Sequence, residues 1–175
     1  MVNVIKEKVA AAEVVLVGIG EEFAAVKAGA AAALAAYQKL AELLGDKDYF
    51  VVTMNTDDFI YKSELKDDRI VAPCGSDAAG NVVTNENYDE SGYMPQWQCY
   101  TKWLEKTLNR KLCILELGVG FQYPTVIRFP FEKVTYFNQK SEFIRVNSKF
   151  AQLTPEIKER STAISESPVD ILNRM

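Results

Sequence analysis

Three short apolar runs, each ending abruptly in glycine or polar residues, limit the folds that this chain can adopt. The most regular is 49–53, which leads into Asn55, Thr56 and two aspartates, and the others are 14–20 and 112–120. A continuous apolar run of this length is typical of a parallel strand that is buried on both faces. Open α/β sheets bind their ligands at the carboxyl ends of such strands. The sequence therefore predicts one ligand cleft at this end of a sheet.

Strand-like and helix-like segments alternate along the chain. Strands are expected at 13–18, 49–53, 69–72, 112–117 and 142–147, with a last short strand near 163–164. Helices are expected at 2–12, 21–44, 57–62 and 93–109, and further helix starts at Thr154 and Ser167. The alternation predicts an α/β, three-layer Rossmann-like fold, in which a mostly parallel sheet of about five to six strands carries helices on both faces. We expect residues 1–175 to form a single domain.

Two segments have an unusual composition. Residues 24–36 are rich in alanine, which has the highest helix propensity but carries little side-chain information. Residues 76–81 are polar and contain glycine, as in a flexible linker. The sequence is compatible with a natural or an engineered origin for both segments.

Composition and charge argue against several classes of partner. The formal net charge of −4 and the lack of a basic run give no reason to expect nucleic-acid binding, and the chain has no histidine to complete a metal site. No apolar run is long enough to span a membrane, and residues 1–6 lack the shape of a signal peptide. Cys74, Cys99 and Cys113 form no Cys-x-x-Cys pair, and Cys113 is expected in the core. We therefore expect no nucleic acid, membrane or metal partner, and a cytoplasmic location with reduced thiols.

Gly18, Ile19 and Gly20 lie where the first strand meets the following helix. Glycine in such a turn lets backbone N–H groups approach a phosphate, so these residues are candidates for binding a nucleotide cofactor. Glu21 and Glu22 follow immediately, and their carboxylates favour a helix start but repel a phosphate. The alternative interpretation is a tight turn before a self-capped helix.

Asn55 and Asp57 follow the second strand and are candidates for binding a ligand in the cleft. An amide at a strand end can hold a ribose hydroxyl or a water, and a carboxylate accepts hydrogen bonds from sugar or amide groups. Alternatively, both side chains satisfy the next turn and cap the helix expected at 57–62. Asn147, at the end of the fifth strand, has the same two interpretations: a ribose contact or a capped turn.

Two further charged residues are candidates for a role in the cleft. Arg128 is a possible anion clamp, although a solvated surface arginine is the favoured interpretation. Glu116 lies within an apolar strand, where a carboxylate needs a partner, and we expect a structural hydrogen bond for it.

The order of these motifs resembles the sirtuin (Sir2-like) family, a Rossmann-type fold that binds NAD. The matching motifs are Gly18-Ile19-Gly20, Thr53-Met54-Asn55-Thr56-Asp57, Gly118-Val119-Gly120-Phe121 with Pro124, and Val146-Asn147. The resemblance implies catalytic roles for Asn55 and Asp57, with Asn55 positioning the reacting ribose. It also implies a group of cofactor-binding residues: Gly18, Ile19, Gly20, Thr53, Gly118, Val119, Gly120 and Asn147. The segment 115–120 is especially similar to a bacterial sirtuin branch associated with ADP-ribosyl transfer and macrodomain operons.

The chain also departs from the family pattern. Cys74 stands where the family has its catalytic histidine, and a thiol with a pKa above neutral does not easily replace that base. Met54 replaces a glutamine that helps to hold the cofactor, and Val119 and Gly120 replace a threonine and a serine that donate to phosphate. The small zinc module of the family is missing, and residues 76–81 occupy its expected place.

The resemblance implies a divergent sirtuin-fold protein that binds NAD or an ADP-ribose-like nucleotide. The implied reaction is cleavage of the nicotinamide–ribose bond with ADP-ribosyl transfer to a protein acceptor or water, rather than lysine deacylation. The alternative is a catalytically inactive or engineered Sir2-like scaffold with a vestigial cleft. A third possibility is a protein-interaction module that uses Trp97 and Trp103, although the helical spacing of these aromatic residues favours core packing.

Overall fold

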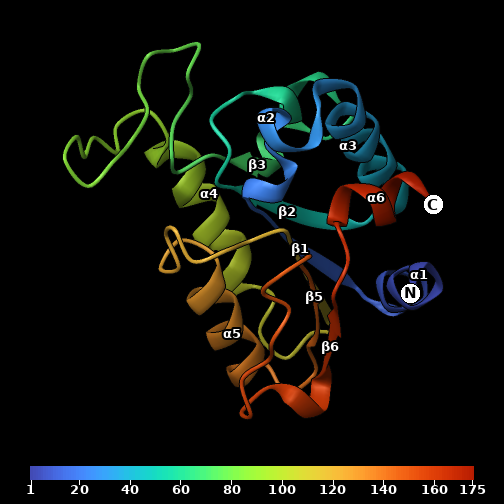
Figure 1. The fold of residues 1–175 in the computed structure, drawn as a ribbon. Helices are drawn as coiled ribbons and strands as arrows, with labels where there is room; N and C mark the ends of the chain where they lie inside the picture. Colours follow the sequence, from blue (N-terminus) through green and yellow to red (C-terminus); the bar gives the residue numbers. More distant parts are fainter.

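A computed structural model describes residues 1–175 and contains one six-stranded sheet in which every strand pair is parallel (Figure 1). Its strands are β1 (Val14–Ile19), β2 (Asp48–Thr53), β3 (Ile70–Val71), β4 (Leu112–Leu117), β5 (Glu142–Val146) and β6 (Ser161–Ile164). Their order in the sheet is β3-β2-β1-β4-β5-β6. This order is that of a doubly wound Rossmann-type sheet, so the predicted fold class is confirmed.

Helices cover both faces of the sheet (Figure 1). The α-helices are α1 (Val2–Ala11), α2 (Ala25–Ala28), α3 (Ala30–Leu44), α4 (Met94–Glu105), α5 (Arg128–Phe137) and α6 (Pro168–Asn173). Four 3₁₀ turns complete the regular structure: η1 (Glu21–Phe23), η2 (Phe59–Lys62), η3 (Asp67–Arg69) and η4 (Lys158–Arg160). In Figure 1, α1, α3 and α6 lie on one side of the sheet, and α4 and α5 on the other.

The apolar core has two halves because successive strand residues point to opposite faces of a sheet. Val15 and Val17 of β1 belong to the cluster under α1, α3 and α6, whereas Leu16 belongs to the cluster under α4 and α5. Every residue of β1 and β4 is buried. This burial on both faces explains why the strand sequences are continuous apolar runs rather than alternating ones.

The prediction of one continuous helix at 21–44 is wrong. The segment instead forms η1, α2 and α3, with a break at Gly29, whose φ is +85°. A glycine at a positive φ adopts a conformation that alanine strongly disfavours, so Gly29 overrides the helix propensity of its neighbours. From Ala33 onwards α3 buries one face, at Ala33, Ala36, Tyr37, Leu40 and Leu44.

Two other helix expectations differ from the structure. Helix α5 was not expected, because Pro130 lies inside it. This proline occupies the first turn, where its missing N–H costs no intrahelical hydrogen bond. Thr154 begins a turn that leads only to η4. By contrast, Ser167 does begin a helix, and its hydroxyl accepts a hydrogen bond from the Asp170 N–H at 3.3 Å.

The segment between β3 and α4 carries no helix or strand. It protrudes from the body of the molecule as the green loops in Figure 1, and it includes the linker-like residues 76–81. None of the helices combines the length and the apolar character that are needed to cross a membrane.

Candidate functional site at the carboxyl edge of the sheet

The carboxyl ends of the central strands meet at one edge, and backbone hydrogen bonds join them. The Gly20 N–H donates to the Leu117 carbonyl at 2.9 Å, and the Met54 N–H donates to the Ile19 carbonyl at 2.9 Å. The Gly118 N–H donates to the Val146 carbonyl at 2.8 Å. The strand order reverses between β1 and β4, which is the point where open α/β sheets bind ligands. The motif residues after β1, β2, β4 and β5 are therefore neighbours.

The glycines at this edge allow the turns to pack against one another. A Cβ atom on Gly20 would lie 2.3 Å from the Gly118 carbonyl oxygen, and Gly118 has a φ of +69°. Gly18 differs, because it lies inside β1 and a Cβ there would lie 2.5 Å from Cγ2 of Ile127. Gly18 thus makes room for α5, and the buried Ile19 belongs to the apolar core.

The carboxylates of Glu21 and Glu22 turn back onto amides of the neighbouring strand ends. The Gly120 N–H donates to Oε2 of Glu21 at 3.0 Å. The Ser148 N–H donates to the two carboxylate oxygens of Glu22 at 3.1 and 3.2 Å, and the Ser148 hydroxyl donates to Glu22 as well. Neither glutamate caps its own 3₁₀ turn, so the interpretation as a self-capped helix is wrong.

Asn55 holds the turn after β1. Its amide donates to the Gly20 carbonyl at 3.1 Å and to the Tyr37 hydroxyl at 3.4 Å. Its own N–H donates to the Thr53 hydroxyl oxygen at 3.1 Å, and Thr53 is fully buried. Burial raises the pKa of the Tyr37 hydroxyl, which therefore stays protonated at neutral pH. Asn55 is half-buried, so its amide is fixed and only partly accessible.

Asp57 accepts two backbone hydrogen bonds. The Ala25 N–H donates to it at 2.8 Å and the Phe59 N–H at 3.2 Å. The carboxylate thus ties the first residue of α2 to the turn before η2. The Phe59 contact satisfies the next turn, as the structural alternative for Asp57 expects, and each carboxylate oxygen accepts one of the two hydrogen bonds.

Asn147 is buried and organises the turn after β5. Its amide donates to the Val119 carbonyl at 3.1 Å. Its side-chain oxygen accepts from the N–H groups of Lys149 at 2.9 Å and Phe150 at 2.7 Å. Val119 is fully buried, so of the segment 118–120 it contributes backbone rather than side chain to this edge.

A buried network of charged side chains holds the loops after β4 and β5. Arg128 is 3 % exposed and donates to the carbonyls of Val119 at 2.9 Å and Phe150 at 2.8 Å, so the expectation of a solvated arginine is wrong. Glu116 accepts a two-pronged contact from Arg145, at 2.6 and 3.0 Å, as expected for a buried carboxylate. Arg145 was not singled out from the sequence, although an arginine inside an apolar strand directly opposite Glu116 is a recognisable signal.

Two cavities flank the joined turns. The first, which we call the edge cavity, has a volume of about 460 Å³ and lies between η1, α2, the turn after β5 and α6. Its charged lining residues are Glu21, Glu22, Lys27, Lys149 and Asp170, and Asn147 also reaches it. No ion pair involves Lys27 or Lys149. The size lies within the range of small-molecule sites.

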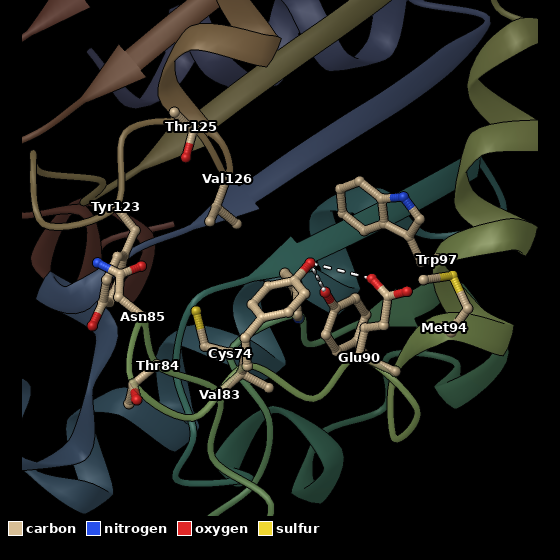
Figure 2. Close-up of a pocket in the computed structure, with 13 residues that line it drawn as sticks. Cys74, Val83, Thr84, Asn85, Glu90, Met94, Trp97, Tyr123, Thr125 and Val126 are labelled. Carbon is tan, nitrogen blue, oxygen red and sulfur yellow. Dashed lines mark hydrogen bonds between the residues drawn. The ribbon is translucent and has the colours of Figure 1, made fainter.

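The second cavity, which we call the Cys74 cavity, has a volume of about 320 Å³. Figure 2 shows Tyr123, Thr125 and Val126 on one side of it, and Cys74 with Trp97 across from them. Trp97 thus lines a cavity, whereas Trp103 is buried in the core as predicted, next to the buried Tyr100. Burial raises the pKa of the Cys74 thiol to about 11. At neutral pH this thiol is protonated and does not serve as a base.

NAD would fit the two ends of this edge better than its centre. The edge cavity lies beside the turn after β5 and the Cys74 cavity beside the turn after β3, whereas Asn55 lines neither of them. At the centre, the Gly120 and Ser148 amides already donate to carboxylates, and a Cβ on Gly120 would lie 2.0 Å from Oε1 of Glu21. The central turns therefore do not fit a phosphate in this arrangement.

Comparison with known proteins identifies the fold. No family model matches the sequence. A protein ADP-ribosyltransferase of Staphylococcus aureus (strain Mu50) is 27% identical over 78 residues, which are 45% of this chain and 25% of the relative, so the chain spans a quarter of that relative's length. A solved structure of a triple mutant of a Sir2 homologue, in complex with 2′-O-acetyl-ADP-ribose, matches with a TM-score of 0.58 and 10% identity over 99% of this chain and 94% of that chain. The chain is therefore Sir2-like in fold, as its motifs predicted.

Proposed function

We propose that this chain binds an ADP-ribose-containing nucleotide, with NAD as the candidate cofactor, along the carboxyl edge of its sheet. The observation that carries the proposal is the order of the motif residues. Following the strands from β5 to β3, the edge presents Asn147, Gly118, Gly20, Asn55 and then Cys74. Four strand spacings of about 4.8 Å amount to about 19 Å, a length comparable to that of an extended dinucleotide.

The likeness to known proteins supports this proposal. The Sir2 homologue of similar fold was solved with an ADP-ribose derivative, and the sequence relative is named a protein ADP-ribosyltransferase. The reaction we propose is cleavage of the nicotinamide–ribose bond with ADP-ribosyl transfer to a protein acceptor or water. Asn55 and Asp57 would position the reacting ribose. Lysine deacylation is disfavoured, because the chain has no histidine and Cys74 stays protonated.

Ligand-dependent stability tests the binding step. A ligand that binds only the native state raises the melting temperature, and the stabilisation grows with the logarithm of its concentration relative to the dissociation constant. We expect NAD and ADP-ribose at millimolar concentration to raise the melting temperature, with adenine alone as the control. Unchanged melting with both nucleotides would reject nucleotide binding at this edge.

Nicotinamide release tests the reaction step. We expect Asn55→Ala to lower the rate by about tenfold or more, because misplacement of a reacting group by about 1 Å can cost a hundredfold. Asn3→Ala is the matched control, since Asn3 is an exposed asparagine of α1. Melting curves of both variants separate a loss of folding from a loss of rate. Equal rates in the two variants would remove Asn55 from the reaction.

The second candidate is a Sir2-fold scaffold that no longer binds a nucleotide, whether natural or engineered. The specific observation in its favour is the pair of carboxylates that already accept hydrogen bonds at the central turns. The two candidates differ in the melting experiment, because a scaffold without a working cleft is not stabilised by either nucleotide.

A further inference from the structure

The central turns of the edge carry backbone amides that face carboxylates of the same chain. Gly120 and Ser148 follow two neighbouring strands, β4 and β5, and each donates its N–H to a different glutamate of η1. Backbone N–H groups at such turns are the usual donors to a nucleotide phosphate. Two carboxylates therefore already accept hydrogen bonds from amides that a phosphate at these turns would need.

The contact is built into the backbone on both sides. The Glu22 N–H donates to the Gly118 carbonyl at 3.2 Å, and the Gly20 N–H to the Leu117 carbonyl at 2.9 Å, so η1 is fastened against the end of β4. At Gly120 a Cβ would lie 2.0 Å from Oε1 of Glu21, so the carboxylate packs directly against this glycine. The backbone of η1 is thus held next to the turn that carries the Gly120 amide.

The charges around the contact have both signs, because Asp170 lines the edge cavity together with two lysines. Lys27 and Lys149 line the same edge cavity, and neither forms an ion pair. Glu21 and Glu22 form no ion pair either. A phosphate that arrives here meets two free cations, but it also meets two carboxylates already bound to the amides it needs. Like charges placed next to each other strongly oppose binding.

We propose that Glu21 and Glu22 act as an internal substitute for the phosphates of the nucleotide and so determine which anions this edge accepts. This inference rests on the proposed function for the identity of the ligand. A nucleotide binds only after displacing the two carboxylates from the amides of Gly120 and Ser148. The two residues are specificity-determining, because they weaken binding of every phosphate whose other contacts do not compensate for the displacement.

Calorimetric titration with inorganic pyrophosphate and with ADP-ribose tests this inference. We expect the double variant Glu21→Ala/Glu22→Ala to bind both ligands at least about tenfold more tightly than the wild type. Alanine keeps each Cβ and frees both amides. The matched control is Glu7→Ala/Glu64→Ala, which also removes two carboxylates, but from exposed sites away from the edge, and should not change either affinity.

A second variant separates charge from folding. Glu21→Gln/Glu22→Gln keeps an oxygen that accepts from each amide and removes both charges, so we expect a smaller gain in affinity than with alanine. Circular dichroism establishes that each variant is folded. If the alanine variant does not fold, the affinities of the glutamine variant decide the question. The inference is overturned if the glutamine variant binds neither ligand more tightly than the wild type.

The outcomes also distinguish this inference from the proposed function. Affinities that are equal in the wild type, the variants and the control overturn the inference, even if ADP-ribose binds all of them. Weaker binding by the alanine variant overturns it too, because the carboxylates would then accept hydrogen bonds from ligand hydroxyls. Tighter pyrophosphate binding in the alanine variant, with ADP-ribose binding no better than pyrophosphate, supports the inference and rejects the nucleotide function.

Discussion

At the scale of single residues, Cys74 has the environment of an inert buried thiol although it lines a cavity. Cys74 is 8 % exposed, and burial raises the pKa of its thiol to about 11. Cys113 is fully buried in the core, as predicted, and burial raises its pKa to about 12. Cys99 is exposed on α4. The thiolate is the reactive form, so these three cysteines should differ in reactivity in a way that depends on pH.

We predict that iodoacetamide modifies Cys99 first and that modification of Cys74 rises about tenfold per pH unit from pH 7 to pH 9. A raised pKa means that the thiolate fraction grows with pH until the pH reaches the pKa, so the rate increases throughout this window. Peptide mass spectrometry after timed labelling measures each rate, and Cys99→Ser removes the competing site. Faster labelling of Cys74 than of Cys99 at pH 7 would show a thiolate at neutral pH and would restore Cys74 as a candidate base.

The contacts of Glu21 and Glu22 illustrate what single residues do not reveal in a sequence. Their position after a glycine turn predicted a conflict with phosphate. Their hydrogen-bond donors, Gly120 and Ser148, lie 99 and 126 residues further along the chain. Only the strand order brings these amides to the glutamates, so local sequence patterns carry no signal for the contact.

At the scale of elements, Arg128 ties the first turn of α5 to the loops after β4 and β5. It donates to the carbonyls of Val119 and Phe150, lies 3.5 Å from Glu116, and stacks 4.2 Å from the centre of the Phe121 ring. The loops after β4 and β5 are therefore anchored to α5, on the face of the sheet opposite to α1, α3 and α6. An arginine is suited to this role because its planar fork donates in several directions at once.

We predict that Arg128→Met lowers the free energy of unfolding by about 3 kcal/mol, because it leaves a buried carboxylate with one cation fewer and removes the only recorded donor to the Phe150 carbonyl. Urea unfolding measures the change. The control is Arg174→Met, which breaks an exposed ion pair with Glu166 and should cost less than about 1 kcal/mol. Equal losses in the two variants would contradict the anchoring role of Arg128.

The elements also divide into those that the sequence predicts and those that it does not. The strand at Leu112–Leu117 lies where its apolar run indicates, because burial on both faces requires an unbroken run. Helix α5 escapes detection, since Pro124 and Pro130 suggest interruptions and only the observed register reveals that Pro130 lies in the first turn. In the alanine-rich segment the sequence predicts too much helix. Propensity indicates one continuous helix, whereas Gly29, at a positive φ, divides it into α2 and α3.

At the scale of the whole molecule, parallel strands determine where the site lies. Because all six strands run in the same direction, the four motif turns lie at one edge, and the loops that precede the strands lie at the other. This convergence was predictable from the apolar runs and their polar ends. The contacts of Glu21 and Glu22 with amides of the central turns were not predictable in this way.

Hydrogen exchange distinguishes a ligand at this edge from a ligand elsewhere. We predict that ADP-ribose slows the exchange of amides at 20–22, 55–57, 118–120 and 147–149 more than at the opposite edge, at 45–47, 109–111 and 138–140. A ligand at about 100 times its dissociation constant adds about 2.7 kcal/mol to global stability, so amides that exchange only through global unfolding slow everywhere. Loop amides exchange through local opening, so a difference between the two sets of loops reports direct contact.

The same experiment tests the strand-end order as a whole. A nucleotide that extends along the edge protects the turns after β5, β4, β1 and β2 together, because each strand end contributes one contact. Protection limited to the turn after β5 would mean that only the edge cavity is used and that the carboxylates still block the centre. Suppose that only the turn after β5 is protected in the wild type, whereas 118–120 and 55–57 are protected as well in Glu21→Ala/Glu22→Ala. The two glutamates would then be what keeps the ligand from the central turns. Equal protection of both edges would contradict a ligand site at the carboxyl ends of the strands.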